Sequence, residues 1–443
     1  MIVVWALLCA LPLALSHDLG GPLGLVALAP MMALSLRRER AFTFGFLCGF
    51  FEVSLTMWGA SGYTVMIPMT LALQGGLARG ALAWAVSLRS GPVLPLSVLV
   101  VGQGLRTTSV LTLPLSCGHD LAAWWWLGLP AAWGGGALLT AICGGVSYAL
   151  VEPAFRRRGA VLLLVLIVIT GAHELLRPVQ GEPIPLKASV IQGGLPNWVY
   201  RQASVDPDAA QLINARYLEV AARERPGRLL ILPETAVRET WGSGPMTRAY
   251  RALHGRGDDL VAGVNYHLDG ALRNSAMVWR SDRPEPVFQT KRAVVPVVER
   301  EFEALRSADA ELPFGGRVQL CIESVYPRYS DPSAGWLLVL SNDAGVGRSA
   351  PRRAFERESR LRALETGRSL VRAGQDGLTY LVSPRGQIVN QLEPYSPGVL
   401  RLESLPAPRW ALRGWLGDWI FGGACCLILG WSLARRRRRE QLA

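Results

Sequence analysis

Apolar residues fill the first 172 positions of the chain in nearly continuous runs, and this feature limits the folds that the chain can adopt. A helix needs about 20 apolar residues to cross the hydrocarbon of a bilayer, and several of these runs reach that length. A second apolar stretch covers 411–434, whereas the sequence between the two has the mixed composition of a globular domain. We therefore predict a membrane part, a water-exposed part and a closing membrane anchor.

The apolar runs indicate eight membrane spans. They lie near 2–16, 20–36, 42–60, 63–87, 91–110, 131–152, 160–172 and 411–434. The first run is read as a span and not as a signal peptide, because no basic residues precede it and no clear small-residue cleavage site follows it. The Gly- and Pro-rich stretch 112–135 is expected to form a re-entrant or interfacial element instead of a clean span.

Basic clusters beside the spans predict the orientation. With the N-terminus in the cytoplasm, "RRER" at 37–40, Arg89, "FRRRG" at 155–159 and "RRRRR" at 435–439 all fall on the cytoplasmic side, as the positive-inside rule requires. This rule accounts for the formal net charge of +12. The globular part shows no basic stripe interleaved with aromatic residues, so we expect no nucleic-acid partner.

Three parts follow from this topology. They are a transmembrane domain of about seven spans at 1–172, an extracytoplasmic domain at 173–408, and a final transmembrane helix with a basic cytoplasmic tail at 411–443. Short buried strands alternate with helices in the middle part and are followed by a hairpin, which is typical of an α/β layered fold. The expected strands are 187–194, 228–235, 259–267, 274–280, 317–324 and 335–343, the expected helices 206–224 and 351–373, and the expected hairpin 378–394.

Cys321 is the one cysteine of the middle part, while the other six lie in the apolar parts. An oxidising compartment favours paired cysteines, so a lone thiol is either buried and inert or kept for chemistry. A thiol is a weak nucleophile until a base removes its proton. The histidines of this part, His173, His254 and His267, are interpreted as surface residues, which leaves a carboxylate as the alternative base.

Two other strand ends carry suitable charges. Glu234 ends the run "LLILPE", and Lys291 lies in "VFQTKRAVVP". A carboxylate in a dry pocket can act as a general base, and an ammonium group can hold a thiolate and a developing oxyanion. Glu234, Lys291 and Cys321 follow three separate strands and are therefore expected to meet at one edge of a sheet.

These three residues resemble the Glu-Lys-Cys triad of the nitrilase, or carbon-nitrogen hydrolase, superfamily. The matching motifs are "LPET" at Glu234, the lysine ahead of "VVP", "LCIES" at Cys321, "SNDA" at 341–344, "RALETGRSLVRA" at 362–373 and "PRGQI" at 384–388. Eight spans with an outward nitrilase domain between the last two resemble the apolipoprotein N-acyltransferase family. The resemblance implies a multi-span helical membrane domain joined to an extracytoplasmic αββα sandwich.

The resemblance also implies roles for individual residues. Glu234 would be the general base, Cys321 the nucleophile and Lys291 the group that stabilises the oxyanion. Glu299 and Glu323 match further acidic positions of the family pocket. From the residues alone, Glu323 is equally well read as a solvated strand-end charge, and Glu299 as the start of a surface helix.

The implied reaction is a two-step acyl transfer without a cofactor or a metal. Cys321 would take an acyl chain from a phospholipid and pass it to the α-amine of the diacylglyceryl-cysteine at a lipoprotein N-terminus. Both substrates are lipids, which gives a physical reason for joining the domain to membrane spans. The implied location is the bacterial inner membrane, with the catalytic domain on the periplasmic side.

Two loops depart from the family pattern and keep other functions open. The residues at 345–349 replace an expected Trp-Phe-Gly-Asp-Ser, and those at 296–299 replace an expected Pro-Phe-Gly-Glu. The alternatives are a membrane-tethered amidase or another acyltransferase with the same triad, including a paralogue of the conjugal-transfer type, and a non-catalytic scaffold. No Gly-rich phosphate loop follows a strand, and no clustered His or Cys residues indicate a metal site.

Overall fold

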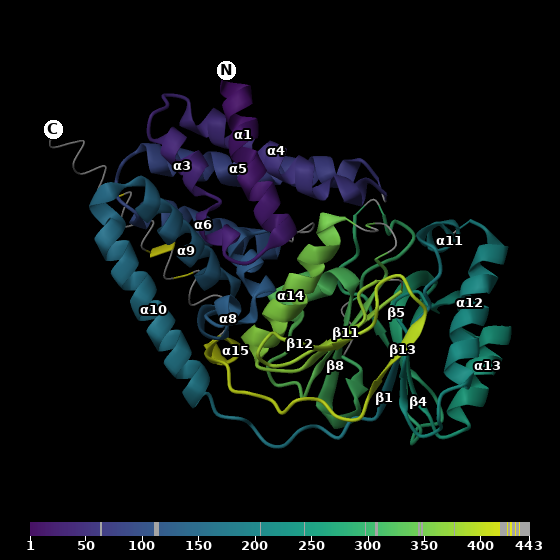
Figure 1. Cartoon of the computed structure of the whole chain (residues 1–443). Coiled ribbons are helices and arrows are strands. Elements are labelled where there is room, and N and C mark those ends of the chain that lie inside the picture. Colours follow the sequence, from purple (N-terminus) through teal and green to yellow (C-terminus); the bar gives the residue numbers. More distant parts are fainter. Residues whose placement is uncertain are drawn as a thin grey trace. The chain divides into compact units, whose positions relative to one another are not determined.

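The structure is a computed structural model of the whole chain (Figure 1). It describes residues 1–416 except 63, 110–114, 204, 243, 297, 306–308, 344, 345, 347, 348 and 376, and beyond 416 only 423, 426, 427, 430 and 434. The chain divides into two compact units. The helical unit comprises Met1–Pro178, Ser349–Thr366 and Ala411–Ala443, and the sheet unit comprises Val179–Arg348 and Gly367–Trp410.

The helical unit consists of helices, as the apolar runs predict. They are α1 Ile2–Leu19, α2 Leu23–Val26, α3 Ala29–Ser35, α4 Ala41–Met57, α5 Met66–Ser87, α6 Val93–Thr108, α7 Cys117–Asp120, α8 Trp125–Gly128, α9 Ala131–Val151, α10 Arg156–Leu176, α14 Ala350–Thr366 and α15 Leu412–Leu416. Among the described helices, three are long and apolar enough to cross a membrane: Ile2–Leu19, Ala41–Ser61 and Ala131–Val151.

The other expected spans are less clear in the structure. The spans expected at 63–87, 91–110 and 160–172 correspond to α5, α6 and α10, but the span expected at 20–36 is divided between α2 and α3. The described part of 112–135 contains short helices and no single long one. The eighth span, at 411–434, lies mostly outside the described residues, as does the basic tail.

Close packing of α4 against α5 shows why small residues recur in these apolar runs. A Cβ atom added to Gly49 would lie 2.3 Å from the carbonyl oxygen of Gly75, and one added to Gly45 would lie 2.4 Å from that of Arg79. Small residues let membrane helices approach until their backbones touch, which increases the van der Waals contact between them. The glycines therefore determine how closely α4 and α5 approach.

The sheet unit contains two mixed sheets. The first has the order β13-β1-β2-β4-β5-β6, with β3 paired to β4, and the second has the order β12-β11-β10-β9-β8-β7. Their strands are β1 Ala188–Gln192, β2 Leu229–Ile231, β3 Val237–Thr240, β4 Asp259–Leu268, β5 Ala271–Trp279, β6 Val287–Thr290, β7 Glu311–Leu312, β8 Gly316–Leu320, β9 Leu337–Ser341, β10 Leu370–Gly374, β11 Tyr380–Val382, β12 Ile388–Gln391 and β13 Gly398–Leu402.

The strands at the centre of each sheet are parallel and mostly buried. β1, β2 and β4 run parallel in the first sheet, and β8, β9 and β10 run parallel in the second. Strands covered on both faces read as continuous apolar runs, which is the pattern of "LLVL" in β9. Because parallel strands end at the same edge, the residues after β2, β8 and β9 are brought to one side of their sheets.

Two apolar cores hold the layers of the sheet unit together. The core between the sheets combines Val190 and Ile231 of the first sheet with Val318 and Leu340 of the second. A second core packs the other face of the first sheet against α11 Asn197–Gln202, α12 Pro207–Ala222 and α13 Pro245–His254. Figure 1 shows these helices beside the strands. The unit therefore has a layer of helices and two layers of strands.

The helix expected at 351–373 is shorter than predicted and belongs to the other unit. The stretch 351–373 is read from the sequence as a single helix within the globular part, but α14 ends at Thr366 and Leu370–Gly374 form β10. Gly367 follows the helix with a φ of 68°, a backbone conformation that ends helices and suits glycine. In addition, α14 packs with the helical unit, whereas β10 lies in the sheet unit.

Candidate active site

The three residues of the expected triad follow strands of both sheets. Glu234 lies just beyond β2 and Lys291 directly after β6 in the first sheet, while Cys321 directly follows β8 in the second. Glu234 and Lys291 are buried, with exposed fractions of 2% and 1%, and Cys321 is partly exposed. The structure thus brings two buried charges and an accessible thiol to the same region of the sheet unit.

Lys291 is held between two carboxylates. Its Nζ atom lies 2.8 Å from Oε1 of Glu234 and 2.7 Å from Oε1 of Glu299. The side-chain amide of Asn274 donates hydrogen bonds to the same two oxygens, at 2.9 and 3.1 Å. Glu299 is half-buried and also accepts a hydrogen bond from the backbone N–H of Val295 at 2.6 Å. Glu299 is therefore part of the site and does not begin a surface helix.

The second oxygen of Glu234 and its backbone are fixed as well. Oε2 accepts a hydrogen bond from the backbone N–H of Asn342 at 2.9 Å. Gln375 donates from Nε2 to the carbonyl oxygen of Glu234 and to the hydroxyl of Thr235, at 2.6 and 2.8 Å. Thr235 has a φ of 55°, an uncommon value for a β-branched residue. These bonds hold the carboxylate of Glu234 in one orientation.

Cys321 lies at a strained junction. Its φ is 47°, and it begins the short 3-10 turn Cys321–Val325 immediately after β8. Non-glycine residues with positive φ cost free energy and are frequent at functional sites. The hydroxyl oxygen of Ser341, at the end of β9, lies 3.6 Å from the sulfur. The turn thus separates the thiol from the strand and places it beside the end of the neighbouring strand.

The pKa of the thiol shows that Cys321 rests in its protonated form. Although the residue keeps some contact with solvent, burial of the sulfur raises the pKa of Cys321 to about 12, and the negative charge of Glu234 acts in the same direction. Lys291 opposes this shift. The interaction of the thiol with both charges means that Glu234 and Lys291 lie close enough to act on it electrostatically.

Lys291 keeps its charge in this setting. Burial by itself lowers the pKa of Lys291, but Glu234 and Glu299 outweigh that effect and hold it well above its ordinary value. The resting site therefore contains a neutral thiol, an ammonium group and carboxylates. Such a site supports attack by sulfur only if the proton of the thiol is taken up during the reaction, and a carboxylate is the base at hand.

Glu323 has a different place from the other acids. Its side chain is fully buried and accepts hydrogen bonds from the backbone N–H groups of Arg292 and Leu320, at 2.6 and 3.0 Å. The guanidinium of Arg292 is 3.1 Å away. The interpretation of Glu323 as a solvated charge is therefore wrong. Its bonds tie the turn after β8 to the residue that follows Lys291.

Several residues of the site were not singled out from the sequence. Arg372, on β10, donates to both Ser341 and Asp343, at 2.7 and 2.9 Å, and Ser341 also donates to Asp343 at 2.7 Å. Asp343 is buried in this group. The signal that could have indicated Arg372 is a charged residue inside the otherwise apolar strand "LVRAG". Asn274 and Gln375 gave no such signal.

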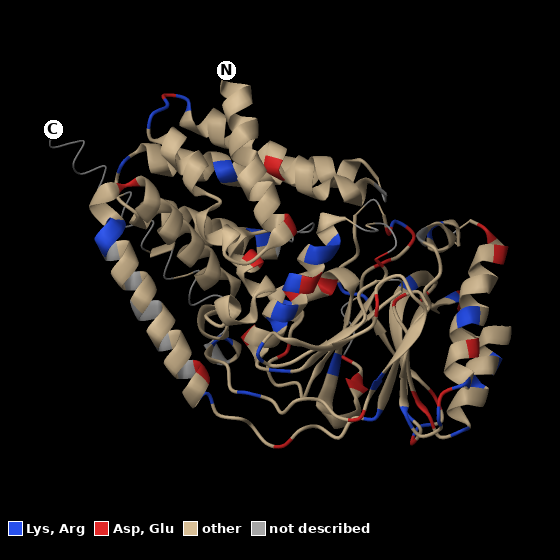
Figure 2. Cartoon of the chain, in the orientation of Figure 1, with Lys and Arg blue, Asp and Glu red and all other residues tan. Residues whose placement is uncertain are grey.

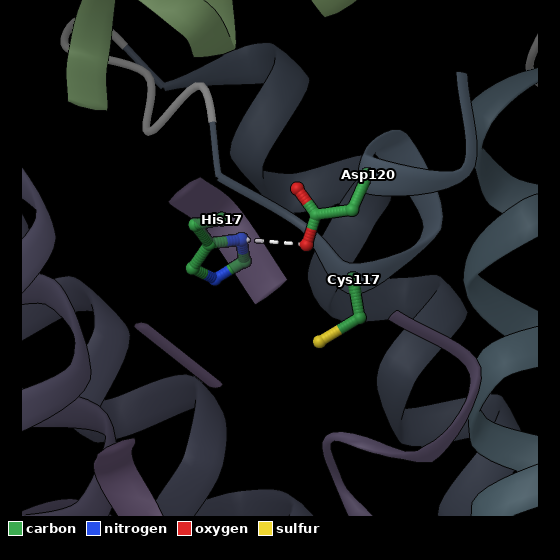
Figure 3. A group of neighbouring side chains, drawn as sticks. All are labelled: His17, Cys117 and Asp120. Atoms are coloured by element: carbon green, nitrogen blue, oxygen red, sulfur yellow. Dashed lines mark ion pairs between the residues drawn. The ribbon is translucent and has the colours of Figure 1, made fainter. Parts of the chain in front are cut away.

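A group of residues that could hold a metal occurs in the helical unit, where the sequence showed no clustered ligands. His17, Cys117 and Asp120 are all buried, and their ligand atoms lie within 4.8 Å of one another. Figure 3 shows the imidazole of His17 facing the carboxylate of Asp120, with the sulfur of Cys117 nearby. Nδ1 of His17 lies 2.8 Å from this carboxylate.

Neighbouring residues already compensate the charges of this group. Nε2 of His17 is 2.8 Å from Glu52, which also forms an ion pair with Arg79 at 2.6 Å. Asp120 forms its own ion pair with Arg357 of α14 at 2.8 Å. Each carboxylate thus has a guanidinium partner, so the geometry is that of a buried ion-pair network that links five helices, α1, α4, α5, α7 and α14. We build no reaction step on it.

Comparison with known proteins agrees with the motifs. No family model matches the chain. Curated proteins named apolipoprotein N-acyltransferase do match: that of Methylococcus capsulatus is 26% identical over 64% of this chain and 61% of its own length, and that of Pseudomonas aeruginosa 25% over 69% and 66%. That of Azotobacter vinelandii is 27% identical over 68% and 65%. These matches confirm the resemblance to apolipoprotein N-acyltransferases.

The matched proteins are longer than this chain. The chain spans 61–66% of the length of the three relatives named above. Among solved structures, a carbon-nitrogen hydrolase superfamily protein from Xanthomonas campestris is 17% identical, covers 50% of this chain and 91% of its own, and has a TM-score of 0.41. An amidase of the nitrilase superfamily from Nesterenkonia is 19% identical, with coverages of 52% and 93% and a TM-score of 0.39.

Proposed function

We propose that this chain is a membrane-bound N-acyltransferase that uses Cys321 to carry an acyl chain as a thioester. The donor is a phospholipid, and the acceptor is the α-amine of the diacylglyceryl-cysteine at a lipoprotein N-terminus. The observation that carries the proposal is the group of Glu234, Lys291 and Cys321, in which a partly exposed thiol interacts with a buried carboxylate and a buried ammonium. The curated relatives support the choice of acyl transfer.

In the first step Glu234 accepts the proton of the thiol as the sulfur attacks the ester carbonyl of the phospholipid. A carbon–sulfur bond forms, and negative charge develops on the carbonyl oxygen, where the ammonium of Lys291 stabilises it. The ester carbon–oxygen bond then breaks. The departing lysophospholipid oxygen takes the proton from Glu234, which leaves a thioester on Cys321 and an ionised carboxylate.

In the second step the amine of the acceptor attacks the thioester. Glu234 accepts a proton from the attacking nitrogen, and Lys291 again stabilises the oxyanion. The carbon–sulfur bond breaks, an amide is formed, and the sulfur leaves as a thiolate that recovers its proton from Glu234. The site returns to its resting state with a neutral thiol, which agrees with the raised pKa of Cys321.

Glu299 and Asn274 act on this cycle through Glu234 and Lys291. Lys291 bridges two carboxylates, so the charge of one is offset while the other remains available as a base. Asn274 donates to the same two carboxylate oxygens that the ammonium of Lys291 contacts, and so helps to hold both carboxylates in place. Glu323 acts at a greater distance, because its bonds position the turn that carries Cys321.

The proposal includes the topology expected from the sequence. Residues 1–172 form the transmembrane domain, 173–408 the catalytic domain on the periplasmic side of a bacterial inner membrane, and 411–443 a final helix with a basic cytoplasmic tail. Three helices long and apolar enough to cross a membrane support membrane insertion. The positions of the basic clusters support the orientation.

The decisive experiment is a search for the covalent intermediate. The purified full chain is incubated with a phospholipid labelled in its acyl chain, and the peptide that contains Cys321 is analysed by mass spectrometry. We expect an acyl adduct on Cys321 that hydroxylamine removes. Addition of a diacylglyceryl-cysteine peptide is expected to discharge the adduct and yield an acylated peptide. Lack of any adduct in protein that is folded and inserted would overturn the covalent mechanism.

A membrane-tethered amidase, or another acyltransferase with the same triad, is the second candidate function. The observation that favours it is the altered sequence of two loops, 345–349 and 296–299. Most of the first loop lies outside the described residues. The same experiment separates the two functions: release of free fatty acid at an equal rate with and without the acceptor peptide indicates that water resolves the thioester.

A further inference from the structure

An apolar groove runs along three helices of the helical unit and takes no part in the proposed reaction. Its volume is about 250 Å³, and its walls include Leu96 of α6, Ile142 and Gly145 of α9, Leu163 of α10, and Phe155 directly before α10. Among the lining residues whose side chains the structure describes, only Tyr148 has a polar group. In a membrane-embedded unit such a groove faces acyl chains and not water, so its shape and chemistry suit a hydrocarbon chain.

Gly145 leaves the groove open in the middle of α9. A Cβ atom added at this position would meet no other atom within 4 Å. At the neighbouring Gly144, by contrast, an added Cβ atom would lie 2.4 Å from the side chain of Leu99, so that side of the helix is closely packed. The sequence "GG" at 144–145 therefore serves two purposes: the first glycine allows helix packing, and the second keeps space free.

A basic pair lies at one end of the same groove. Arg156 and Arg157 begin α10 between the lining residues Phe155 and Gly159, and both side chains are exposed. Arg156 donates to the carbonyl oxygen of Leu150 near the end of α9, at 3.4 Å, so it reaches towards the opposite wall. In Figure 2 the ribbon near the upper end of α10, where this helix begins, is blue, the colour of Lys and Arg. The acidic residue of this turn is Glu152, between the two helices.

We propose that this groove binds one acyl chain of an anionic phospholipid, whose phosphate is held by Arg156 and Arg157. Exposed arginines at the cytoplasmic end of a span attract anionic headgroups, and an apolar groove that starts beside them fixes the position of the lipid. Under the proposed topology this lipid comes from the cytoplasmic leaflet. It is therefore a different molecule from the acyl donor, which the proposed catalytic domain meets on the periplasmic side. The inference rests on the proposed membrane insertion and does not depend on the acyl-transfer reaction.

The acyl part of the site is tested by filling the groove. The full chain and its Gly145→Leu variant are reconstituted with equal amounts of phosphatidylglycerol and phosphatidylethanolamine, and retained lipid is measured by native mass spectrometry. Gly171→Leu is the matched control, since a Cβ atom at Gly171 also meets nothing within 4 Å and this residue does not line the groove. We expect at least a tenfold loss of bound phosphatidylglycerol in the first variant and none in the second.

The headgroup part is tested by charge. The double variant Arg156→Gln/Arg157→Gln is expected to bind the two lipids equally, while the control Arg37→Gln/Arg40→Gln, at another exposed basic cluster, keeps the preference for phosphatidylglycerol. A phosphatidylglycerol with a photoreactive acyl chain should label the peptide that contains residues 138–149. Equal losses in test and control variants would indicate a general surface-charge effect and overturn the proposal, as would unchanged binding in Gly145→Leu.

The proposed function and this inference can fail separately. Acyl-adduct formation at Cys321 is measured in the same Gly145→Leu preparation. If Gly145→Leu forms the adduct but no longer binds phosphatidylglycerol, both proposals are supported. If it forms the adduct and still binds the lipid, only the proposal of a lipid site in the groove is overturned. Loss of lipid in Gly145→Leu, with retention in Gly171→Leu, supports the groove even if no adduct forms in any variant.

Discussion

The helical unit and the sheet unit each bury a cluster of charged residues, and the two clusters differ in how their charges balance. In the helical unit the carboxylates of Glu52 and Asp120 each form an ion pair with one guanidinium, from Arg79 and Arg357. In the sheet unit the single ammonium of Lys291 serves both Glu234 and Glu299. The first cluster is balanced, whereas the second has one carboxylate more than it has cations.

The surplus carboxylate matters because of what lies beside it. The thiol of Cys321 is partly exposed and stays protonated, so a neighbouring carboxylate without a cation of its own can accept its proton. In the helical unit the nearby thiol, that of Cys117, is buried, and Arg79 lies 3.6 Å from its sulfur. A buried ion pair by itself therefore does not indicate a reaction. A partly exposed thiol beside a carboxylate that has no cation of its own does indicate one.

The largest expected difference between the clusters comes from removing each thiol. Cys321→Ala should lower acyl-transfer activity by about 10⁴-fold or more, because no other group in the site can form the thioester. Cys117→Ala should keep activity within about threefold of the wild type, since it removes only a packed thiol from the helical unit. Turnover of labelled phospholipid measures both. Substantial turnover by Cys321→Ala would exclude the covalent mechanism.

Removing one cation from each cluster sharpens the comparison. Lys291→Met removes the cation that Glu234 and Glu299 share, and Arg79→Met removes the guanidinium that pairs with the buried Glu52, so both should destabilise the protein by about 3–5 kcal/mol. Only Lys291→Met should also abolish adduct formation on Cys321 at a temperature where the protein stays folded. Thermal unfolding followed by fluorescence gives the stabilities. An equal loss of adduct in both variants would contradict the assignment of the helical cluster to structure alone.

The protonated resting thiol predicts the pH dependence of alkylation. Because burial raises the pKa of Cys321 to about 12, its thiolate fraction is small near neutral pH and grows about tenfold with each pH unit below that value. The rate of iodoacetamide labelling at residue 321 should therefore rise without a plateau between pH 7 and pH 10. Mass mapping separates this site from Cys426, which is exposed. A plateau near pH 7 would indicate a preformed thiolate and make Glu234 unnecessary as a base.

The same pKa shift affects stability in a defined direction. A cysteine with its ordinary pKa, about 8.5, loses its proton in the unfolded chain well before Cys321 does in the folded protein. Between these two values the unfolded state binds fewer protons, so the contribution of Cys321 to stability is full below about pH 8.5 and declines as the pH rises towards 12. The decline should be absent in Cys321→Ala.

The sequence predicted the triad because strand ends are visible in a single sequence. Glu234 and Cys321 each follow a short apolar run, but the two runs form strands of different sheets, so the expectation that the residues meet at the edge of one sheet is wrong. Asn274 could not be found in this way, because it lies inside β5 and reaches the site only through the pairing of β5 with β6 and the position of Lys291. Arg372 depends on the order of β8, β9 and β10 in the second sheet.

The apolar runs predicted helices more reliably than they predicted spans. Hydropathy identifies segments that avoid water, but a segment packed inside a bundle has the same composition as one that crosses a bilayer. The run at 20–36 shows this limit, since it forms two short helices joined at residues 27–28. Likewise, the helix α14 ends after Thr366 because Gly367 has a positive φ. This single glycine lies within the motif "RALETGRSLVRA", which reads as one helix in the sequence.

The smallest expected effect comes from comparing a side-chain hydrogen bond with a backbone hydrogen bond to the same residue, Glu234. Asn342 binds Glu234 through its backbone N–H, which Asn342→Ala retains, whereas Asn274 uses its side-chain amide to donate to both Glu234 and Glu299. Asn274→Ala should therefore lower kcat by about 10²-fold, a loss typical of a positioned hydrogen-bond donor, and Asn342→Ala by less than about tenfold. Steady-state acyl transfer with both variants measures the difference. Equal losses would mean that the side chain of Asn342, which donates to the hydroxyl of Thr235 at 3.1 Å, is as important to the site as the amide of Asn274.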